Sequence, residues 1–458
     1  MTNHPTSQET RPSTRSRNII PPDILYLIAS KLPPKEFARA SILSSEWRGC
    51  MRSACPRLTF DAAAICKCER KDLHRHVSQF LSKVNNVLKK HRDKVVEMLQ
   101  VKIDYVDNIL ARHIDTWVDF SVSSRTKSLT LDLRPERFSE YDDLYAFPFH
   151  LLDRGSISRL QHMQLSFVSL NPPSQFKGFP NLRKLHLDTL HIKRNHLENM
   201  LSHCCTLEWL CIDRCRLNDE LIVDSPLPRL LFLRVQFCLT KIKFNAVNLA
   251  TFEYDGSFIP IYLAQSFKLQ SAKVKLSRAV FQHALISLLN GLPTVQKLTL
   301  EFRYQNLEKQ WLWDNPLKFT NLKHLQLSMY IIPKDVDKVL YSLAFLRATP
   351  FIEKLEVHFA GCALWLARTG PCRKGLGQCK YVHLKHIRVT GFRAARGQLE
   401  FLLHVIENAP ALEVVSVEIG QYTAFEYCSD GAINKSKEIA RACMRPILPY
   451  NVTFEIIE

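Results

Sequence analysis

Apolar residues recur along most of the chain at one spacing, in which a first apolar residue is followed by others three and five positions later. Two copies are strict: Phe179 to Leu187 (FPNLRKLHL) and Phe319 to Leu327 (FTNLKHLQL) share the pattern Phe-x-Asn-Leu-basic-x-Leu-x-Leu. Loose matches arise by chance in a hydrophobic chain, but two strict copies that share the preceding Phe-x-Asn are rare. This pair sets the register in which the weaker copies are read.

The same triplet recurs on both sides of the strict pair. Clear members are Leu160/Met163/Leu165, Leu207/Leu210/Ile212, Leu230/Leu233/Val235, Val295/Leu298/Leu300, Ile352/Leu355/Val357, Leu384/Ile387/Val389 and Leu412/Val415/Val417. Weaker members are Leu249/Phe252/Tyr254, Leu269/Ala272/Val274, Val96/Leu99/Val101 and Thr126/Leu129/Leu131. Most intervals between the first positions, from Leu160 to Leu412, fit the repeat length of a leucine-rich repeat. The pattern predicts about thirteen strands.

Each x-Leu-x-Leu segment is typical of a short strand on the concave side of a solenoid, with its leucines pointing inward. Polar residues such as His186 and Gln326 then face solvent, and Lys385 lies next to such a position. Helical apolar spacing between the strands is found near Val106 to Val118, Val280 to Leu289, Val336 to Leu346 and Phe401 to Glu407. The predicted fold class is therefore α/β, an irregular leucine-rich-repeat solenoid that forms a horseshoe arc. The alternative is a globular α/β domain with incidental leucine triplets.

The stretch from Ile20 to Met51 predicts a separate, small helical module. One face of its first helix carries Ile24, Leu25, Ile28 and Leu32. Pro33 and Pro34 break that helix, a second helix runs through Phe37, and Ser44 suits the N-cap of a third that carries Trp47. Three helices in about thirty residues cannot bury this apolar surface by themselves. The module therefore needs a partner.

This module resembles the F-box family, whose pattern runs Leu-Pro-x-Asp/Glu-Ile/Leu-Leu, then Ile, then Leu-Pro, then Val-Leu/Val-Ser-Lys-Arg-Trp. The matching residues are Ile20, Pro21, Asp23, Ile24, Leu25, Ile28, Leu32, Pro33, Ile42, Leu43, Ser44 and Trp47. The resemblance implies docking on a Skp-type adaptor of a cullin-RING (SCF-type) ubiquitin ligase. The adaptor-binding residues that it implies are Ile20, Pro21, Ile24, Leu25, Ile28, Leu32, Pro33, Phe37, Leu43 and Trp47.

Two departures from the family pattern stand out. The opening leucine is Ile20, and Ser45-Glu46 replaces the basic pair before the tryptophan. The second departure alters the surface electrostatics of the docking face, not its helices. An ordinary N-terminal helical hairpin packed on the rest of the chain is the alternative interpretation.

An F-box followed by degenerate leucine-rich repeats resembles the plant F-box/LRR-repeat family, many members of which carry a C-terminal FBD-type region. Gly391 to Ile419 resembles that region, and Lys435 to Arg445 and Val452 to Ile457 then predict a closing helix and strand. The division expected is a disordered tail at 1–17, the F-box at 18–60, a helical linker at 61–93, the repeat solenoid at 94–390, and FBD-like C-terminal repeats with a cap at 391–458.

Composition narrows the functional classes. The 13 glycines form no Gly-rich loop ahead of a helix, so a phosphate-binding loop has no support in the sequence. The polar N-terminal residues lack a signal-peptide pattern, and no apolar run is long enough for a membrane helix. A location in the nucleus, the cytoplasm or both is expected. Most of the 14 cysteines are then expected to be reduced and to pack as small hydrophobic residues.

Several cysteine and histidine groups invite a metal hypothesis. Cys66 and Cys68, with His74 and His76 close behind, are too tightly spaced for the usual zinc pattern. Cys204, Cys205, Cys211 and Cys215 flank a predicted strand, which favours packing, and Cys372 and Cys379 lie in a basic loop. No Ser/His/Asp group or carboxylate pair stands out. The chain is expected to need no cofactor or metal and not to be an enzyme.

The net charge of +18 allows two kinds of partner. Basic residues are spread along the chain, which favours an acidic protein partner over nucleic acid, although short clusters occur around Lys89 and Arg393. Four aromatic residues are candidates either for contact anchors or for core: Phe302, Tyr304, Trp311 and Trp313. The prediction is a ligase substrate receptor that binds the adaptor through its F-box and a target protein through its repeats. A repeat scaffold outside any ligase, or a basic nucleic-acid-binding protein, is the alternative.

Overall fold

The structure of the chain is a computed structural model. It describes Ile24, Ile28 and residues 57–457, except for residues 67–72, 93, 106–107, 138–142, 218–219, 239–240, 258–260, 264–265, 278–280, 304–317, 331–338, 341, 361–378 and 420–429. Most of the predicted F-box module lies outside the described residues.

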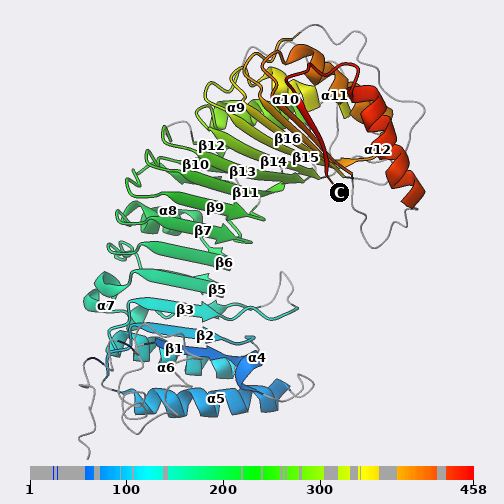
Figure 1. Cartoon of the computed structure of the whole chain (residues 1–458). Helices are drawn as coiled ribbons and strands as arrows, with labels where there is room; N and C mark the ends of the chain where they lie inside the picture. The colour runs from blue at the N-terminus through cyan, green and yellow to red at the C-terminus, as the bar shows by residue number, and fades with distance from the viewer. Residues whose placement is uncertain are drawn as a thin grey trace, which may run out of the picture.

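One parallel sheet runs the length of the described chain and forms the inner side of an arc (Figure 1). Within the described residues it has sixteen strands: β1 (Arg57–Asp61), β2 (Met98–Lys102), β3 (Ser128–Asp132), β4 (Tyr145–Ala146), β5 (His162–Leu170), β6 (Lys184–Ile192), β7 (Trp209–Asp213), β9 (Phe232–Gln236), β11 (Thr251–Ser257), β13 (Ser271–Ser277), β14 (Lys297–Arg303), β15 (His324–Tyr330), β16 (Lys354–Ala360), β17 (His386–Phe392), β18 (Val414–Ile419) and β19 (Thr453–Ile457). Except for β4, which pairs with β5, they follow one another across the sheet in this order. The predicted solenoid is confirmed.

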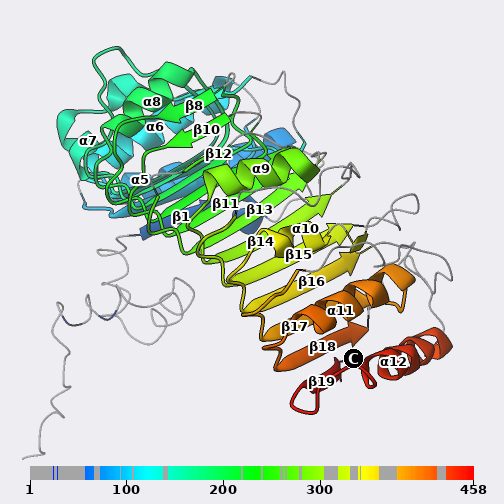
Figure 2. The ribbon, with the colours of Figure 1, turned by 90° about the horizontal axis from the view of Figure 1, so that it is seen from above.

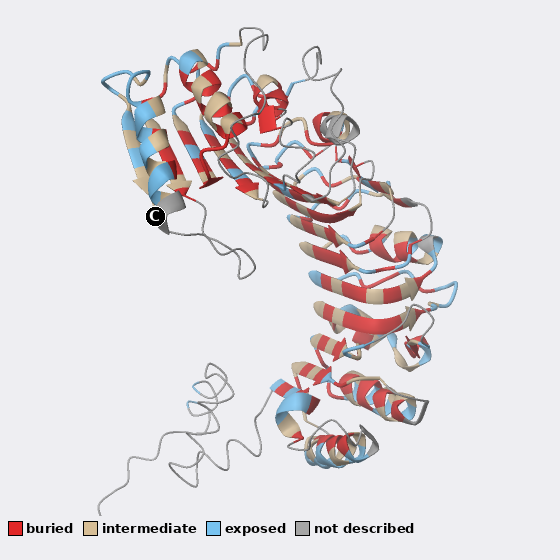
Figure 3. Ribbon diagram, turned by 90° about the vertical axis from the view of Figure 1, so that its right-hand side faces the viewer, coloured by how far each residue is buried: buried red, intermediate tan, exposed pale blue. Residues whose placement is uncertain are grey.

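Buried and more exposed residues alternate along each strand, so one face of the sheet packs into the core of the arc. In β6, Leu185 and Leu187 are fully buried, and the register places them beside Leu210 and Ile212 of β7. The same two positions are buried in strand after strand, which gives the banded burial pattern of Figure 3. Each fully buried leucine contributes roughly 1.5–3 kcal/mol. All thirteen predicted triplets run into strands of this sheet, and the predicted closing strand is β19.

Helices cover part of the outer side (Figure 2). They are α4 (Ala62–Ile65), α5 (Leu73–Lys90), α6 (Asn108–Ser123), η1 (Phe149–Leu151), α7 (Arg154–Arg159), α8 (Arg194–Ser202), α9 (Phe281–Gly291), α10 (Leu343–Arg347), α11 (Arg396–Asn408) and α12 (Asp430–Met444). At the N-terminal end, Phe80 of α5 meets Trp117 of α6 edge-on at 6.1 Å between ring centroids, and Trp117 Nε1 donates to Asn85 Oδ1 at 3.1 Å. These contacts join α5 to α6 at this end of the arc.

A second, small parallel sheet on the outer side was not predicted. It consists of β8 (Glu220–Val223), β10 (Lys241–Phe244) and β12 (Ile261–Tyr262). These strands fall in three consecutive short intervals of the triplet series, between Leu207 and Leu269, whereas α9, α10 and α11 fall in longer intervals. The short intervals leave too few residues for a helix and its two turns, so the outer side is closed by short strands.

Strand β1 was not predicted either. It pairs with β2 in register, and its Leu58 and Phe60 are buried. Residues 57–60, which the sequence division assigned to the end of the F-box, are thus part of the solenoid sheet. Cys55, Leu58 and Phe60 have the spacing of the other triplets, so the signal was present in a single weak copy.

Candidate functional site

The concave face of the arc consists of the strand residues that alternate with the buried leucines. The strand register aligns them in three columns, named here from the N-terminal to the C-terminal end of the strands. The first column is Arg57, Met98, Ser128, His162, Lys184, Trp209, Phe232, Thr251, Ser271, Lys297, His324, Lys354, His386, Val414 and Thr453. The second runs from Thr59 through His186, Cys211 and Arg234 to Glu455.

The third column lies on the same face, four residues after the first column in each strand. Its members are Asp61, Lys102, Asp132, Ser166, Asp188, Asp213, Gln236, Asp255, Lys275, Glu301, Ser328, His358 and Thr390, followed beyond a bulge in β17 by Glu418 and Ile457. Fifteen strands thus present one continuous, largely polar surface.

Two aromatic rings form a step in the first column. Trp209 and Phe232 stack with ring centroids 5.3 Å apart and an interplanar angle of 4°, and both rings are half-buried. His186 meets Trp209 edge-on at 5.9 Å. On the other side, the Arg234 guanidinium lies 5.3 Å from the Phe232 centroid and its Nε donates to Glu253 at 2.6 Å. The step is held between two polar side chains and presents an aromatic surface of the kind that dominates interface energetics.

Cys211 follows Trp209 by two residues in β7 and is not a reactive thiol. It is 2 % exposed, and burial raises its pKa to about 12. A nucleophilic cysteine needs the opposite environment, one that lowers its pKa toward neutrality. Cys211 therefore contributes packing to the concave face.

Left-handed residues shape the rim beside the third column. Thr189 and Arg214 have φ angles of 51° and 47°. In a regular strand, adjacent side chains point to opposite faces, but a left-handed residue breaks this alternation. Arg214 can therefore reach its own neighbour Asp213 at 3.0 Å, and the Thr189 hydroxyl donates to Asp188 at 2.8 Å.

Arginines cover the carboxylates at this rim. Arg134 donates to Asp188 at 2.6 Å, and Arg214 lies 3.9 Å from the same carboxylate. Phe237, itself left-handed with φ of 50°, lies 4.8 Å below the Arg214 guanidinium. Burial raises the pKa of Asp213, while neighbouring arginines oppose that rise. Opposite charges are therefore matched within the rim.

A second polar cluster lies farther along the arc and is centred on Glu356. Its carboxylate accepts from Lys354 at 2.6 Å, from Gln326 at 2.8 Å and from His324 at 3.0 Å. Burial raises the pKa of Glu356, but the hydrogen bonds and charges of these neighbours outweigh it and lower the pKa to about 2. Glu356 thus fixes three side chains of the concave face.

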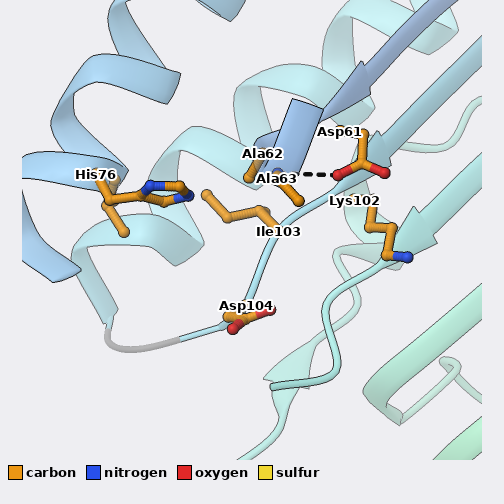
Figure 4. Close-up of a pocket in the computed structure, with 8 residues that line it drawn as sticks. Asp61, Ala62, Ala63, His76, Lys102, Ile103 and Asp104 are labelled. Atoms are coloured by element: carbon orange, nitrogen blue, oxygen red, sulfur yellow. Dashed lines mark hydrogen bonds between the residues drawn. The ribbon is translucent and has the colours of Figure 1, made fainter. Parts of the chain in front are cut away.

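A small pocket lies where α4 and α5 meet the end of β2 (Figure 4). Its volume is about 40 Å³, and it is lined by Asp61, Ala62, Ala63, His76, Val77, Lys102, Ile103 and Asp104. The Asp61 carboxylate accepts from the Ala63 N–H at 2.9 Å, so it already serves as the cap of α4. This volume suits water, not an organic cofactor.

Few of the predicted adaptor-binding residues can be located. Ile24 and Ile28 are helical and are 49 % and 40 % exposed, as a docking face requires. The other eight lie outside the described residues: Ile20, Pro21, Leu25, Leu32, Pro33, Phe37, Leu43 and Trp47.

Most of the candidate metal and anchor residues that the structure describes are buried. The Cys66 thiol is buried and donates to the His76 carbonyl at 3.5 Å, and no group of three metal-binding side chains occurs in the described part of the chain. Cys204, Cys211 and Cys215 are buried and Cys205 is exposed. Phe302 is core, since it is 1 % exposed and packs on Phe345. Cys68, Cys372, Tyr304, Trp311 and Trp313 lie outside the described residues.

Sequence reasoning missed the Trp209–Phe232 step. Both residues directly precede the second apolar residue of a triplet, in Leu207/Leu210/Ile212 and Leu230/Leu233/Val235. Two aromatic residues at one repeat position in consecutive repeats were the available signal.

A parallel-stranded arc with a polar concave face is the architecture of a leucine-rich-repeat protein. Residues 87–447 match the family described as "At1g61320/AtMIF1, LRR domain", and residues 18–58 match the F-box domain. The chain therefore belongs to this leucine-rich-repeat family and carries an F-box, as the sequence resemblance indicated.

Relatives with the same combination occur in Arabidopsis thaliana. F-box/FBD/LRR-repeat protein At1g13570 is 24% identical over 418 residues, which cover 87% of this chain and 89% of the relative. F-box/FBD/LRR-repeat protein At4g26340 is 22% identical over 416 residues, covering 87% and 92%. F-box/LRR-repeat protein At3g58900 is 26% identical over 336 residues, covering 64% and 97%. The F-box and repeats together support a role of the substrate-adaptor type, and the F-box implies binding to a Skp-type adaptor. In the described regions, none of the helices has the length and apolar character needed to cross a membrane.

Proposed function

We propose that the chain is the substrate-recognition subunit of a cullin-RING (SCF-type) ubiquitin ligase. The F-box residues bind the Skp-type adaptor, and the concave face binds a target protein. One observation carries the proposal: an F-box match at residues 18–58 runs directly into an arc whose inner face is open and polar.

The junction between the two parts matters for this role. The matched F-box range ends at residue 58, and β1 begins at Arg57, so the two share two residues and no linker separates them. A short connection raises the effective concentration of a bound target near the ligase. The chain needs no chemistry of its own for this function, because bringing the target to the ligase is its contribution.

Adaptor binding tests the proposal. The full chain is co-expressed with a Skp-type adaptor, and the variants Leu25→Asp and Trp47→Ala are compared with the wild type by co-purification. Each variant removes apolar surface from the predicted docking face, so we expect adaptor recovery to fall at least tenfold.

Trp209→Ala serves as the control, since it removes an aromatic ring of the same kind from the concave face. It should retain full adaptor recovery. Unchanged adaptor recovery with both F-box variants would contradict the ligase proposal. Binding of RNA or DNA with a steep salt dependence would favour the nucleic-acid alternative.

A further inference from the structure

The first and third columns of the concave face differ sharply in charge. The fifteen residues of the first column include no Asp or Glu, and seven are basic or histidine: Arg57, His162, Lys184, Lys297, His324, Lys354 and His386. The fifteen residues of the third column include three that are basic or histidine, Lys102, Lys275 and His358, and seven acids: Asp61, Asp132, Asp188, Asp213, Asp255, Glu301 and Glu418. The two columns are four residues apart along each strand, roughly 13 Å. A mainly basic strip, the first column, and a mainly acidic strip, the third column, therefore run along the arc with the second column between them.

Partners within the chain neutralise much of the acidic strip. The side chain of Asp188 is 7% exposed beneath Arg134 and Arg214, which are 34% and 41% exposed. Farther along, Glu301 pairs with Lys275 at 3.0 Å and Glu418 with Arg388 at 2.6 Å. These carboxylates have limited capacity to bind an incoming cation.

Three members of the basic strip are themselves paired, since His324 and Lys354 contact Glu356 and His386 lies 4.0 Å from Glu413, so the open part of the strip lies around Lys184 and Lys297. Lys184 and Lys297 are exposed, and neither makes an ion pair within the described part of the chain. A local positive potential acts on His162, whose pKa is lowered by burial first and then by the nearby Lys184 and Arg183. The strip can therefore bind an anionic partner.

The spacing along the first column adds a second constraint. Lys184 is one strand from Trp209, and Lys297 is three strands from Phe232, with only Thr251 and Ser271 between. Strands lie about 4.8 Å apart, so these separations are about 5 Å and about 14 Å. An extended chain at roughly 3.4 Å per residue spans them with one or two residues and with about four residues.

We propose that the segment captured by this arc is an acidic peptide that lies along the first column. An apolar side chain of the peptide packs on the Trp209–Phe232 step, a carboxylate one or two residues to one side of it pairs with Lys184, and a carboxylate about four residues to its other side pairs with Lys297. The proposal rests on the proposed function, since it names the chemistry of the target. The net charge of +18 speeds the encounter with such a segment.

Synthetic peptides test the proposal directly. The probe is a fluorescein-labelled peptide with a central Phe, a Glu two residues before it and two Glu residues four and six positions after it, on a Gly/Ser background, made in both sequence directions. Matched peptides carry Lys in place of Glu, or Ala in place of Phe. Anisotropy titrations use the full chain at low and at physiological salt.

The acidic Phe peptide should bind in one of its directions, and the Lys and Ala peptides should bind at least tenfold more weakly. The double variant Lys184→Glu/Lys297→Glu should lose about tenfold in affinity for the acidic peptide and gain affinity for the Lys peptide. The control Lys89→Glu/Lys193→Glu makes the same charge change at exposed positions on α5 and just before α8, and should remain within twofold of wild type.

Equal affinity for acidic and Lys peptides, equal effects of the two double variants, or no binding of either acidic peptide would each overturn the inference. Tighter binding of a labelled single-stranded RNA to the same strip would overturn it in favour of nucleic acid. Adaptor co-purification is measured on the same preparations. Loss of adaptor binding with peptide binding intact counts against the ligase role alone, whereas the reverse counts against the acidic target alone.

Discussion

At the scale of single residues, Glu356 shows how the concave face keeps its shape. Three neighbours from β15 and β16 point their donors at this one carboxylate, and its low pKa records how strongly they stabilise the charged form. The side chains of Lys354, Gln326 and His324 are therefore held in defined positions. A surface that recognises a peptide requires such fixed side chains.

Glu356→Gln tests this role. At pH 7 the substitution should lower the free energy of unfolding by about 1 kcal/mol, because a carboxylate with several donors is lost. The pKa of Glu356 is about 2 in the folded chain against an ordinary value of 4.5, so its contribution is complete above pH 4.5 and is lost as the pH falls toward 2. The stabilities of wild type and variant should thus converge over that range. The charged groups that face Glu356 are Lys354, His324 and Arg388, and they are the same in both proteins.

Urea denaturation at several pH values provides the measurement. Glu208→Gln is the matched control, since among the described residues the Glu208 carboxylate has one ion contact, with Arg183 at 4.0 Å, and it should change stability by less than about 0.5 kcal/mol. A gap between wild type and Glu356→Gln that stays constant from pH 7 to pH 2.5 would contradict the assignment.

At the scale of elements, the start of α11 is tied to β17 by one side chain. Gln398 is fully buried, and its Oε1 accepts from the N–H groups of Arg393 at 2.8 Å and Ala395 at 3.3 Å. Its Nε2 donates to the Gly391 carbonyl at 2.9 Å, and Gly391 has a φ of 68°. The amide therefore satisfies three backbone groups where the chain turns from strand to helix.

Gln398→Leu should lower the free energy of unfolding by about 3 kcal/mol, because buried backbone donors and an acceptor lose their partners. Thermal unfolding measures the loss. Gln398→Glu keeps an acceptor for the two N–H groups and should recover part of the stability. Equal stability of the Leu variant and the wild type would show that the turn does not depend on this amide.

The strands of the concave side could be predicted from the sequence. Leucine triplets identified every strand from β2 to β18 on the concave side apart from the two-residue β4, because a strand that buries alternate residues needs that spacing. Strands β8, β10 and β12 are too short to show a period. The shared repeat position of Trp209 and Phe232 would have placed them side by side, but the parallel stacking of their rings depends on side-chain conformations that the sequence does not show.

At the scale of the whole molecule, each strand of the arc contacts mainly its neighbours, so stability is transmitted locally. Leu210 is fully buried in β7, and Leu210→Ala should cost about 2–5 kcal/mol within its own repeat. Hydrogen exchange should become faster in β6, β7 and β9 and stay unchanged in β17.

Hydrogen exchange followed by mass spectrometry measures this spread. Leu355→Ala in β16 is the matched control and should give the reverse pattern, with faster exchange in β15 to β17 and no change in β6. Faster exchange along the entire sheet in both variants would mean that the arc opens as one cooperative unit.

The F-box could be assigned from its motif, whereas the charge separation across the concave face was not predicted, although its two columns stand two and six residues after the first apolar residue of each triplet. The triplets do not show where the alternation of faces ends, because the left-handed residues Thr189 and Arg214, which end it directly after the third column, have no signal in the triplet pattern.

The buried cysteines make local opening of the middle repeats measurable by thiol labelling. Cys204, Cys211, Cys215 and Cys238 all lie between α8 and the segment just after β9, each at most 4 % exposed. A thiol reagent can modify them only when the middle repeats open, so the labelling rate measures the frequency of that opening. Exposed Cys205, in the same segment, reacts without any opening and supplies the reference rate from the same molecule.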